Sequence, residues 1–164
     1  MVQTVTVLII VLLIAVDQAI KLLVLKHLSP LGSYILIDKF ISLTFVKNTG
    51  AAFGSFSGYT AVLSVITALV LIVGLIYLLS GKIKPKILYV PVVMIVSGGA
   101  ANLIDRIFRG YVIDYIEPLF VDFAVFNFAD MLITVGAFII IIYLCYDLLN
   151  DAQKGKKDES YEQH

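Results

Sequence analysis

The sequence predicts an all-α membrane protein with four transmembrane helices, a small extracytoplasmic β-sheet or cradle, and both termini in the cytoplasm. Composition is the first reason: of the 164 residues, 60% are hydrophobic and 15% are charged, with a mean hydropathy of +1.01. Soluble domains are about 45–50% apolar and about 25% charged. The second reason is a set of four long apolar stretches, and the third is a strand-like pattern between them.

A helix needs about 20 mostly apolar residues to cross a bilayer. The four predicted spans are residues 5–25, 60–80, 87–104 and 125–146. The first stretch lacks the basic segment and the small-residue cleavage site of a signal peptide, so we expect it to be retained as a span. The spans form one domain, residues 1–149, and the polar residues 150–164 form a cytoplasmic tail that we expect to be disordered.

Lysines in the short loops set the predicted orientation. The connection between the second and third spans carries Lys82, Lys84 and Lys86 and no acidic residue. Such loops favour the cytoplasmic side. Residues 26–59 and 105–124 then form the outer loops.

The outer loops are predicted to contain the sheet. Ile41, Leu43 and Phe45 alternate with polar residues, which is typical of a strand. A second extended run covers residues 111–116 in the other outer loop. We therefore expect a small sheet at the outer membrane surface.

Several kinds of site are disfavoured by composition. The chain has two histidines and one cysteine, so a histidine-based metal site or a serine–histidine triad is hard to build. We therefore expect no metal and no cofactor. The formal net charge is zero, which gives no indication of nucleic-acid binding.

Polar side chains within apolar spans each need a reason, because a charge at the bilayer centre costs about 2.5–3.5 kcal/mol on insertion scales. Asp17 and Lys21 are one helical turn apart and can pair. In the third span, Gly98, Asn102 and Arg106 recur every four residues and share a face. Close helix packing would explain Gly98, and a position at the membrane interface would explain Arg106. Asn102 is harder to explain, because an amide in lipid requires hydrogen-bond partners.

Two aspartates are predicted to converge at the outer boundary. Asp130 lies near the start of the fourth span, on a stripe with Asn127 and Thr134, and Asp114 lies in the outer segment before it. Asp130 taken alone is equally explained as a helix cap. If the carboxyls meet, they share a proton. One can then activate water for attack on a peptide carbonyl while the other protonates the leaving amine.

Four motifs carry a resemblance to a known family. They are Asp17-Gln18 with Lys21, Asn-Thr-Gly-Ala-Ala-Phe-Gly at 48–54, Gly-Gly-Ala-Ala-Asn-Leu-Ile-Asp-Arg at 98–106 continuing to Val-Ile-Asp-Tyr-Ile at 112–116, and Phe-Asn-Phe-Ala-Asp at 126–130. In this order, and in a chain of this size, they resemble the bacterial lipoprotein signal peptidases, or signal peptidase II. Ala101 and Tyr115 are small departures from the family pattern.

The resemblance implies an aspartic endopeptidase of the bacterial plasma membrane, with its active site at the extracytoplasmic face. Such an enzyme removes the signal peptide of a prolipoprotein by cleaving before a cysteine that carries diacylglycerol. It uses no cofactor, works within the phospholipid bilayer, and is inhibited by the cyclic peptide globomycin.

The resemblance also implies roles for individual residues. Asp114 and Asp130 would be the catalytic pair, and Asp17 with Lys21 would be structural support. The residues expected to hold substrate and the pair are Asn48, Asn102, Arg106 and Asn127, with Gly98 beside them. We also expect residues 48–54 to act as a cradle or lid over the cleft.

Two other classes of function remain open at this stage. One is a small transporter or proton-conducting subunit, which also uses intramembrane carboxylates. The other is a non-enzymatic assembly or lipid-binding subunit. Asp114→Asn and Asp130→Asn would each abolish a peptidase while leaving it folded, whereas Asp17→Asn is expected to leave Lys21 unpaired and to reduce the amount of folded protein.

Overall fold

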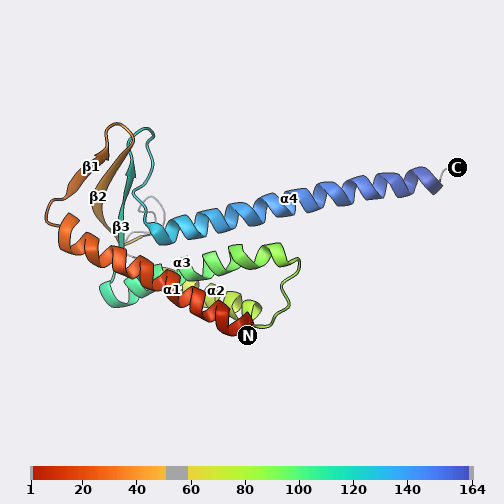
Figure 1. Ribbon diagram of the computed structural model, residues 1–164, viewed down its shortest axis with the longest axis horizontal. Helices are drawn as coiled ribbons and strands as arrows, with labels where there is room; N and C mark the ends of the chain where they lie inside the picture. Colours follow the sequence, from red (N-terminus) through yellow and green to blue (C-terminus); the bar gives the residue numbers. More distant parts are fainter. Residues whose placement is uncertain (1, 51–58, 163–164) are drawn as a thin grey trace.

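The structure is a computed structural model that describes residues 2–50 and 59–162, with side chains as far as residue 150. A three-stranded sheet lies at one end of the four helices (Figure 1). In chain order, the elements are α1 (Val2–Leu23), the π-helical turn η1 (Val24–Leu28), β1 (Ser33–Ile37), β2 (Ile41–Asn48), α2 (Thr60–Leu79), the 3-10 turn η3 (Lys86–Leu88), α3 (Tyr89–Arg109), β3 (Val112–Pro118) and α4 (Phe128–Glu162).

The prediction of four apolar spans is confirmed. Within the described part of the chain, four helical segments are long and apolar enough to cross a membrane: Val2–Leu28, Thr60–Leu79, Lys86–Arg109 and Phe128–Asn150. The third runs past its predicted end and stops at Gly110, whose φ of 78° is the left-handed conformation of a helix C-cap. This extension brings Asp105 and Arg106 into the last turns of α3.

The fourth span, predicted from about residue 125, has its helix from Phe128, because Phe126 pairs with Ile116 as an isolated bridge. One prediction about the segment after this span is wrong. The tail expected to be disordered continues the helix to Glu162, and Figure 1 shows this end of α4 extending beyond the other helices. The tail sequence contains alanine, lysine, glutamine and glutamate, which are strong helix formers, and no proline to end the helix.

The predicted sheet is present, with the antiparallel order β1-β2-β3. Its register places Asn48 opposite Val112 and Val46 opposite Asp114, and it shifts between Leu43 and Val46. Strand β1 was not predicted. Its central residues are all apolar and all exposed, so they lack the alternation that marks a half-buried strand.

Helix α3 lies at the centre of the bundle and contacts the other three helices. Glycines allow these close contacts. A Cβ on Gly98 would lie 2.4 Å from the carbonyl oxygen of Ala129, and a Cβ on Gly136 would lie 2.8 Å from that of Pro91. Small residues at such crossings let helix backbones approach in membranes. The start of α4 is therefore held directly against α3.

The sheet packs on the end of α1. Val24 and Leu28 of η1 form a buried cluster with Ile113 and Tyr115 of β3. Elsewhere the helices expose many large apolar side chains, such as Val73 on α2 and Phe138 on α4. This distribution agrees with a multi-pass membrane protein whose helices face lipid.

Candidate active site

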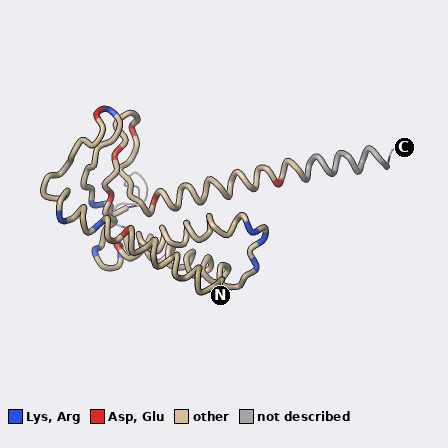
Figure 2. The backbone as a smooth tube through the Cα atoms, in the orientation of Figure 1, with Lys and Arg blue, Asp and Glu red and all other residues tan. Residues whose placement is uncertain are grey.

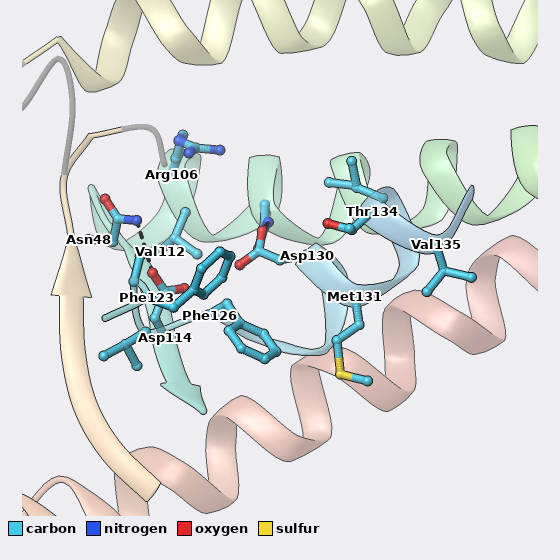
Figure 3. Close-up of a pocket in the computed structure, with 14 residues that line it drawn as sticks. Asn48, Arg106, Val112, Asp114, Phe123, Phe126, Asp130, Met131, Thr134 and Val135 are labelled. Carbon is cyan, nitrogen blue, oxygen red and sulfur yellow. Dashed lines mark hydrogen bonds between the residues drawn. The ribbon is translucent and has the colours of Figure 1, made fainter. Parts of the chain in front are cut away.

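Asp114 of β3 and Asp130 of α4 line the same cavity, whose volume is about 470 Å³ (Figure 3). Asn48, Asn102 and Arg106, which the sequence also singled out, line it with them. Residues far apart in the sequence therefore converge at the junction of the sheet with α3 and α4.

Asp130 is held by a reciprocal cap at the start of α4. Its backbone N–H donates to Asn127 Oδ1 over 2.9 Å, and the Asn127 backbone N–H donates to Asp130 Oδ2 over 3.1 Å. This is the geometry of a capping box. Asp130 Oδ1 accepts a second bond of 2.7 Å from Asn102 Nδ2. The capping interpretation of Asp130 is thus confirmed, and it leaves this carboxylate at the cavity wall.

Two further backbone N–H groups in the first turn of α4 donate hydrogen bonds to side chains from distant parts of the chain. The Phe128 N–H donates to Tyr115 Oη over 3.2 Å, and the Ala129 N–H donates to Asp17 Oδ1 over 3.1 Å. Burial raises the pKa of Tyr115 to about 12, so its hydroxyl is neutral. The first turn of α4 is therefore fixed to both α1 and β3.

Asp114 is buried, and its side-chain partners among residues 2–50 and 59–150 are amides. Its side chain receives Asn48 Nδ2 at 2.9 Å on Oδ2 and Asn127 Nδ2 at 2.7 Å on Oδ1. Burial, helped by the nearby charge of Asp130, raises the pKa of Asp114 to about 6 against the lowering effect of the two amides. Asn127 therefore bonds both aspartates, one through its side chain and one through its backbone.

Asn102 joins this pair of carboxyls to a buried lysine. Its Oδ1 accepts bonds from Lys21 Nζ at 2.9 Å and from Asn127 Nδ2 at 3.2 Å. Because the oxygen faces these two donors, the amide nitrogen must face Asp130. The predicted pairing of Lys21 with Asp17 is confirmed at 2.9 Å.

Lys21 also pairs with Asp105 at 2.8 Å, which the sequence analysis missed. Asp105 in turn pairs with Arg109, one helical turn later, and accepts the Ile113 N–H. The idea that Asp17→Asn would leave Lys21 unpaired is therefore wrong, because Asp105 remains. The spacing of Asp105 and Arg109 could have revealed their pair, whereas a lysine on α1 reaching α3 has no local sequence signal.

Arg106 lies on the cavity wall, where its Nη2 donates to the carbonyl oxygen of Gly50 over 3.1 Å. Its Nε is buried and has no hydrogen-bond partner among the described residues. Gly98 packs against α4 outside the cavity wall, so its expected contact with substrate stays a prediction. Residues 51–54 of the expected lid lie outside the described residues.

The rest of the cavity wall is mainly apolar and comes from the segment before α4 and from its first turns. Thr134 lines the cavity, as its place on the predicted stripe indicated, beside Met131 and Val135 (Figure 3). Phe123 and Phe126 were not predicted as site residues. Among residues 2–50 and 59–162, no group of three or more His, Cys, Asp or Glu side chains could hold a metal ion.

Known proteins resemble this chain over most of its length. The model of the family described as "Signal peptidase (SPase) II" matches residues 9–146. The chain belongs to the signal peptidase II family. A lipoprotein signal peptidase of Clostridium acetobutylicum is 37% identical, over 87% of this chain and 94% of the relative. One of Caldanaerobacter subterraneus is 45% identical, over 76% of this chain and 84% of the relative.

Two solved structures share the fold, and both carry the description of a bacterial membrane enzyme structure obtained by the in meso method. One has a TM-score of 0.80 and 31% identity, covering 90% of this chain and 91% of the solved one. The other has a TM-score of 0.75 and 30% identity, covering 86% and 92%. Signal peptidase II enzymes are aspartic peptidases, so carboxylate chemistry is the activity that the cavity has to explain.

Proposed function

We propose that Asp114 and Asp130, hereafter the dyad, hydrolyse the peptide bond that precedes the diacylglyceryl-modified cysteine of prolipoproteins, which releases the signal peptide. One observation carries the proposal: the buried carboxyl of Asp114 and the half-buried carboxyl of Asp130 line a single cavity and are both bonded by Asn127. The family membership supplies the substrate class. The cavity supplies the chemical groups.

The chemistry needs one proton shared between the dyad carboxyls. The raised pKa of Asp114, about 6, is the shift that such sharing requires. The ionised carboxyl takes a proton from water, and the water oxygen attacks the peptide carbonyl. The protonated carboxyl donates to that carbonyl, and its proton then passes to the leaving amine.

The surrounding amides hold the dyad rather than react. Three asparagine side chains each donate an Nδ2 hydrogen to a dyad carboxyl: Asn48, Asn102 and Asn127. These bonds fix the rotamers of the two aspartates before substrate arrives. Arg106 is suited to hold the peptide, because its buried Nε carries a hydrogen that none of the described residues accepts and that a substrate carbonyl could accept.

We further propose that the dyad faces the outside of the bacterial plasma membrane and that both termini are cytoplasmic. Figure 2 shows basic residues gathered in the connection between α2 and α3, at the opposite end from the sheet. Loops that carry Lys82, Lys84 and Lys86 favour the cytoplasm. The sheet and the dyad then lie at the outer headgroups, where a lipid-anchored cysteine places its peptide bond.

An assay with a diacylglyceryl-modified precursor tests the proposal. The protein, reconstituted in phospholipid, is expected to release the signal peptide from this precursor and not from the same precursor without diacylglycerol. Globomycin is expected to block the reaction. Equal cleavage of both precursors, or cleavage of neither by correctly folded protein, would contradict the proposed substrate.

A further inference from the structure

The loop that follows β3 exposes a run of large apolar side chains. In residues 119–123, hereafter the 119–123 loop, Phe120 is 68% exposed, and Leu119, Val121 and Phe123 are exposed as well. Phe40, in the turn between β1 and β2, is 59% exposed, and its ring centroid lies 6.2 Å from that of Phe120. An exposed cluster of this kind indicates an interaction surface.

The fold holds this loop between the sheet and α4. The Leu119 N–H donates to the carbonyl oxygen of Phe40 over 2.9 Å, and Phe126 exchanges backbone bonds with Ile116. In Figure 1 the strands lie across the helices, with the segment after β3 (teal) on the side towards α4 and β1 on the far side. The loop therefore begins beside the β1–β2 turn and lies on the α4 side of the sheet.

The apolar surface continues from this loop onto the spans. Directly after it, Ala124, Val125 and Phe126 form part of the cavity wall, and the exposed Met131 and Val135 of α4 follow. Side chains on α4 face lipid, so a surface that joins them at the end of the helix lies at the lipid boundary. This continuity points to lipid as the partner of the loop.

We propose that the 119–123 loop and Phe40 insert into the bilayer at the boundary between headgroups and acyl chains, and so anchor the sheet and the adjoining cavity wall to the membrane surface. Asp122 lies within the loop, between Val121 and Phe123, and is exposed. A carboxylate is costly in the hydrocarbon centre and acceptable among headgroups, so the insertion is shallow. The anchor is independent of the catalytic roles proposed for the dyad.

Tryptophan fluorescence tests the proposal directly, because the chain contains no tryptophan. Phe120→Trp introduces a single emitter at an exposed position that already holds an aromatic ring. The full-length protein is reconstituted in phosphatidylcholine brominated either near the headgroup end of the acyl chains or near their tips. Tyr34→Trp, 57% exposed on β1, is the matched control on the far edge of the sheet. Val73→Trp, 68% exposed within α2, reports that the protein has inserted.

The expected result is that lipid brominated near the headgroups quenches Phe120→Trp at least about twofold more than Tyr34→Trp. It should also quench Phe120→Trp more than lipid brominated at the chain tips. Equal quenching of the two variants would overturn the proposal, because the whole sheet would then lie at one depth. Absence of quenching at Phe120→Trp, with Val73→Trp quenched, would also overturn it and leave a protein partner for this surface.

Discussion

Two groups of carboxylates lie side by side in this protein, and their partners are of opposite kinds. In the first group, hereafter the scaffold, both carboxylates are paired with cations. The scaffold consists of Asp17, Lys21, Asp105 and Arg109. In the second group, the dyad, the described part of the chain provides amide donors and no ion pair. The type of residue is the same, and the partner decides the role.

The two groups are one amide apart. Asn102 accepts from the scaffold lysine on its oxygen and donates to Asp130 through its nitrogen. Lys21 therefore makes ion pairs with the scaffold carboxylates and not with the dyad. A carboxylate paired directly with a cation is held ionised and is a poor proton donor. A proton-sharing pair therefore needs neighbours that fix its geometry without forming ion pairs with it.

Removal of either dyad carboxyl is expected to have the largest effect. Asp114→Asn and Asp130→Asn should each lower kcat for the lipidated precursor by about 10²–10⁴-fold or more, because general acid–base catalysis is lost. The amount of folded protein should stay the same or rise. Turnover near the wild-type value in either variant would remove that residue from the dyad.

Breaking an ion pair of the scaffold should lower the stability of the protein rather than remove its catalytic groups. Asp105→Asn removes the partner of two cations and is expected to destabilise the protein by about 3–5 kcal/mol, as for other broken buried pairs. Thermal unfolding in detergent measures this. Asp17→Asn is the matched control and should be milder, because Lys21 keeps Asp105. A larger loss for Asp17→Asn would show that Asp105 is not the principal partner of Lys21.

The stability of the protein should depend on pH through Asp114. Its pKa rises from the ordinary 3.8 to about 6 on folding, so the folded state binds this proton more tightly than the unfolded chain. The stabilisation is full below pH 3.8 and is lost as the pH rises to 6, by up to about 3 kcal/mol at 1.36 kcal/mol per pKa unit. Asp114→Asn should remove this dependence.

Unfolding temperatures of both proteins across this range of pH provide the measurement. The stability of Asp114→Asn relative to wild type should increase as the pH rises. A difference that stays constant with pH would mean that Asp114 titrates in the folded protein as it does in the unfolded chain.

Helix crossings should respond more weakly. Gly98→Ala places a Cβ 2.4 Å from the Ala129 carbonyl oxygen, so the start of α4 must shift. We expect a loss of about 1–3 kcal/mol in stability, together with a fall in kcat. Gly136→Ala is also crowded, but Gly136 lies about two helical turns after Ala129 on α4. This substitution should therefore lower stability with less effect on kcat. Equal kcat values for the two variants would contradict this positional argument.

Local patterns revealed most of the fold. The spans follow from apolar runs, β2 and β3 follow from extended patterns, and the Asp17–Lys21 pair follows from its spacing. Strand β1 was not predicted, because its apolar residues are exposed on both faces and do not alternate with polar ones. The helix in the tail was not predicted, because low hydrophobicity indicates disorder even where the residues have high helix propensity.

The site was only partly visible in the sequence. Motifs indicated Asp114, Asp130 and the asparagines, but no pattern shows that Asn127 bonds both aspartates or that Asp105 reaches Lys21. These contacts join residues from different helices and strands, so they exist only after packing. The apolar wall was missed because phenylalanines near a membrane boundary are unremarkable in sequence.

Infrared spectroscopy of the reconstituted protein tests whether the dyad, whose carboxyls are bonded by amides, holds a proton. We expect a carbonyl band of a protonated carboxyl at pH 5 to 6 that weakens as the pH rises through the Asp114 pKa of about 6. This band should be lost in Asp114→Asn and kept in Asp17→Asn. A spectrum without such a band, or a band that Asp114→Asn leaves unchanged, would show that the two aspartates do not share a proton.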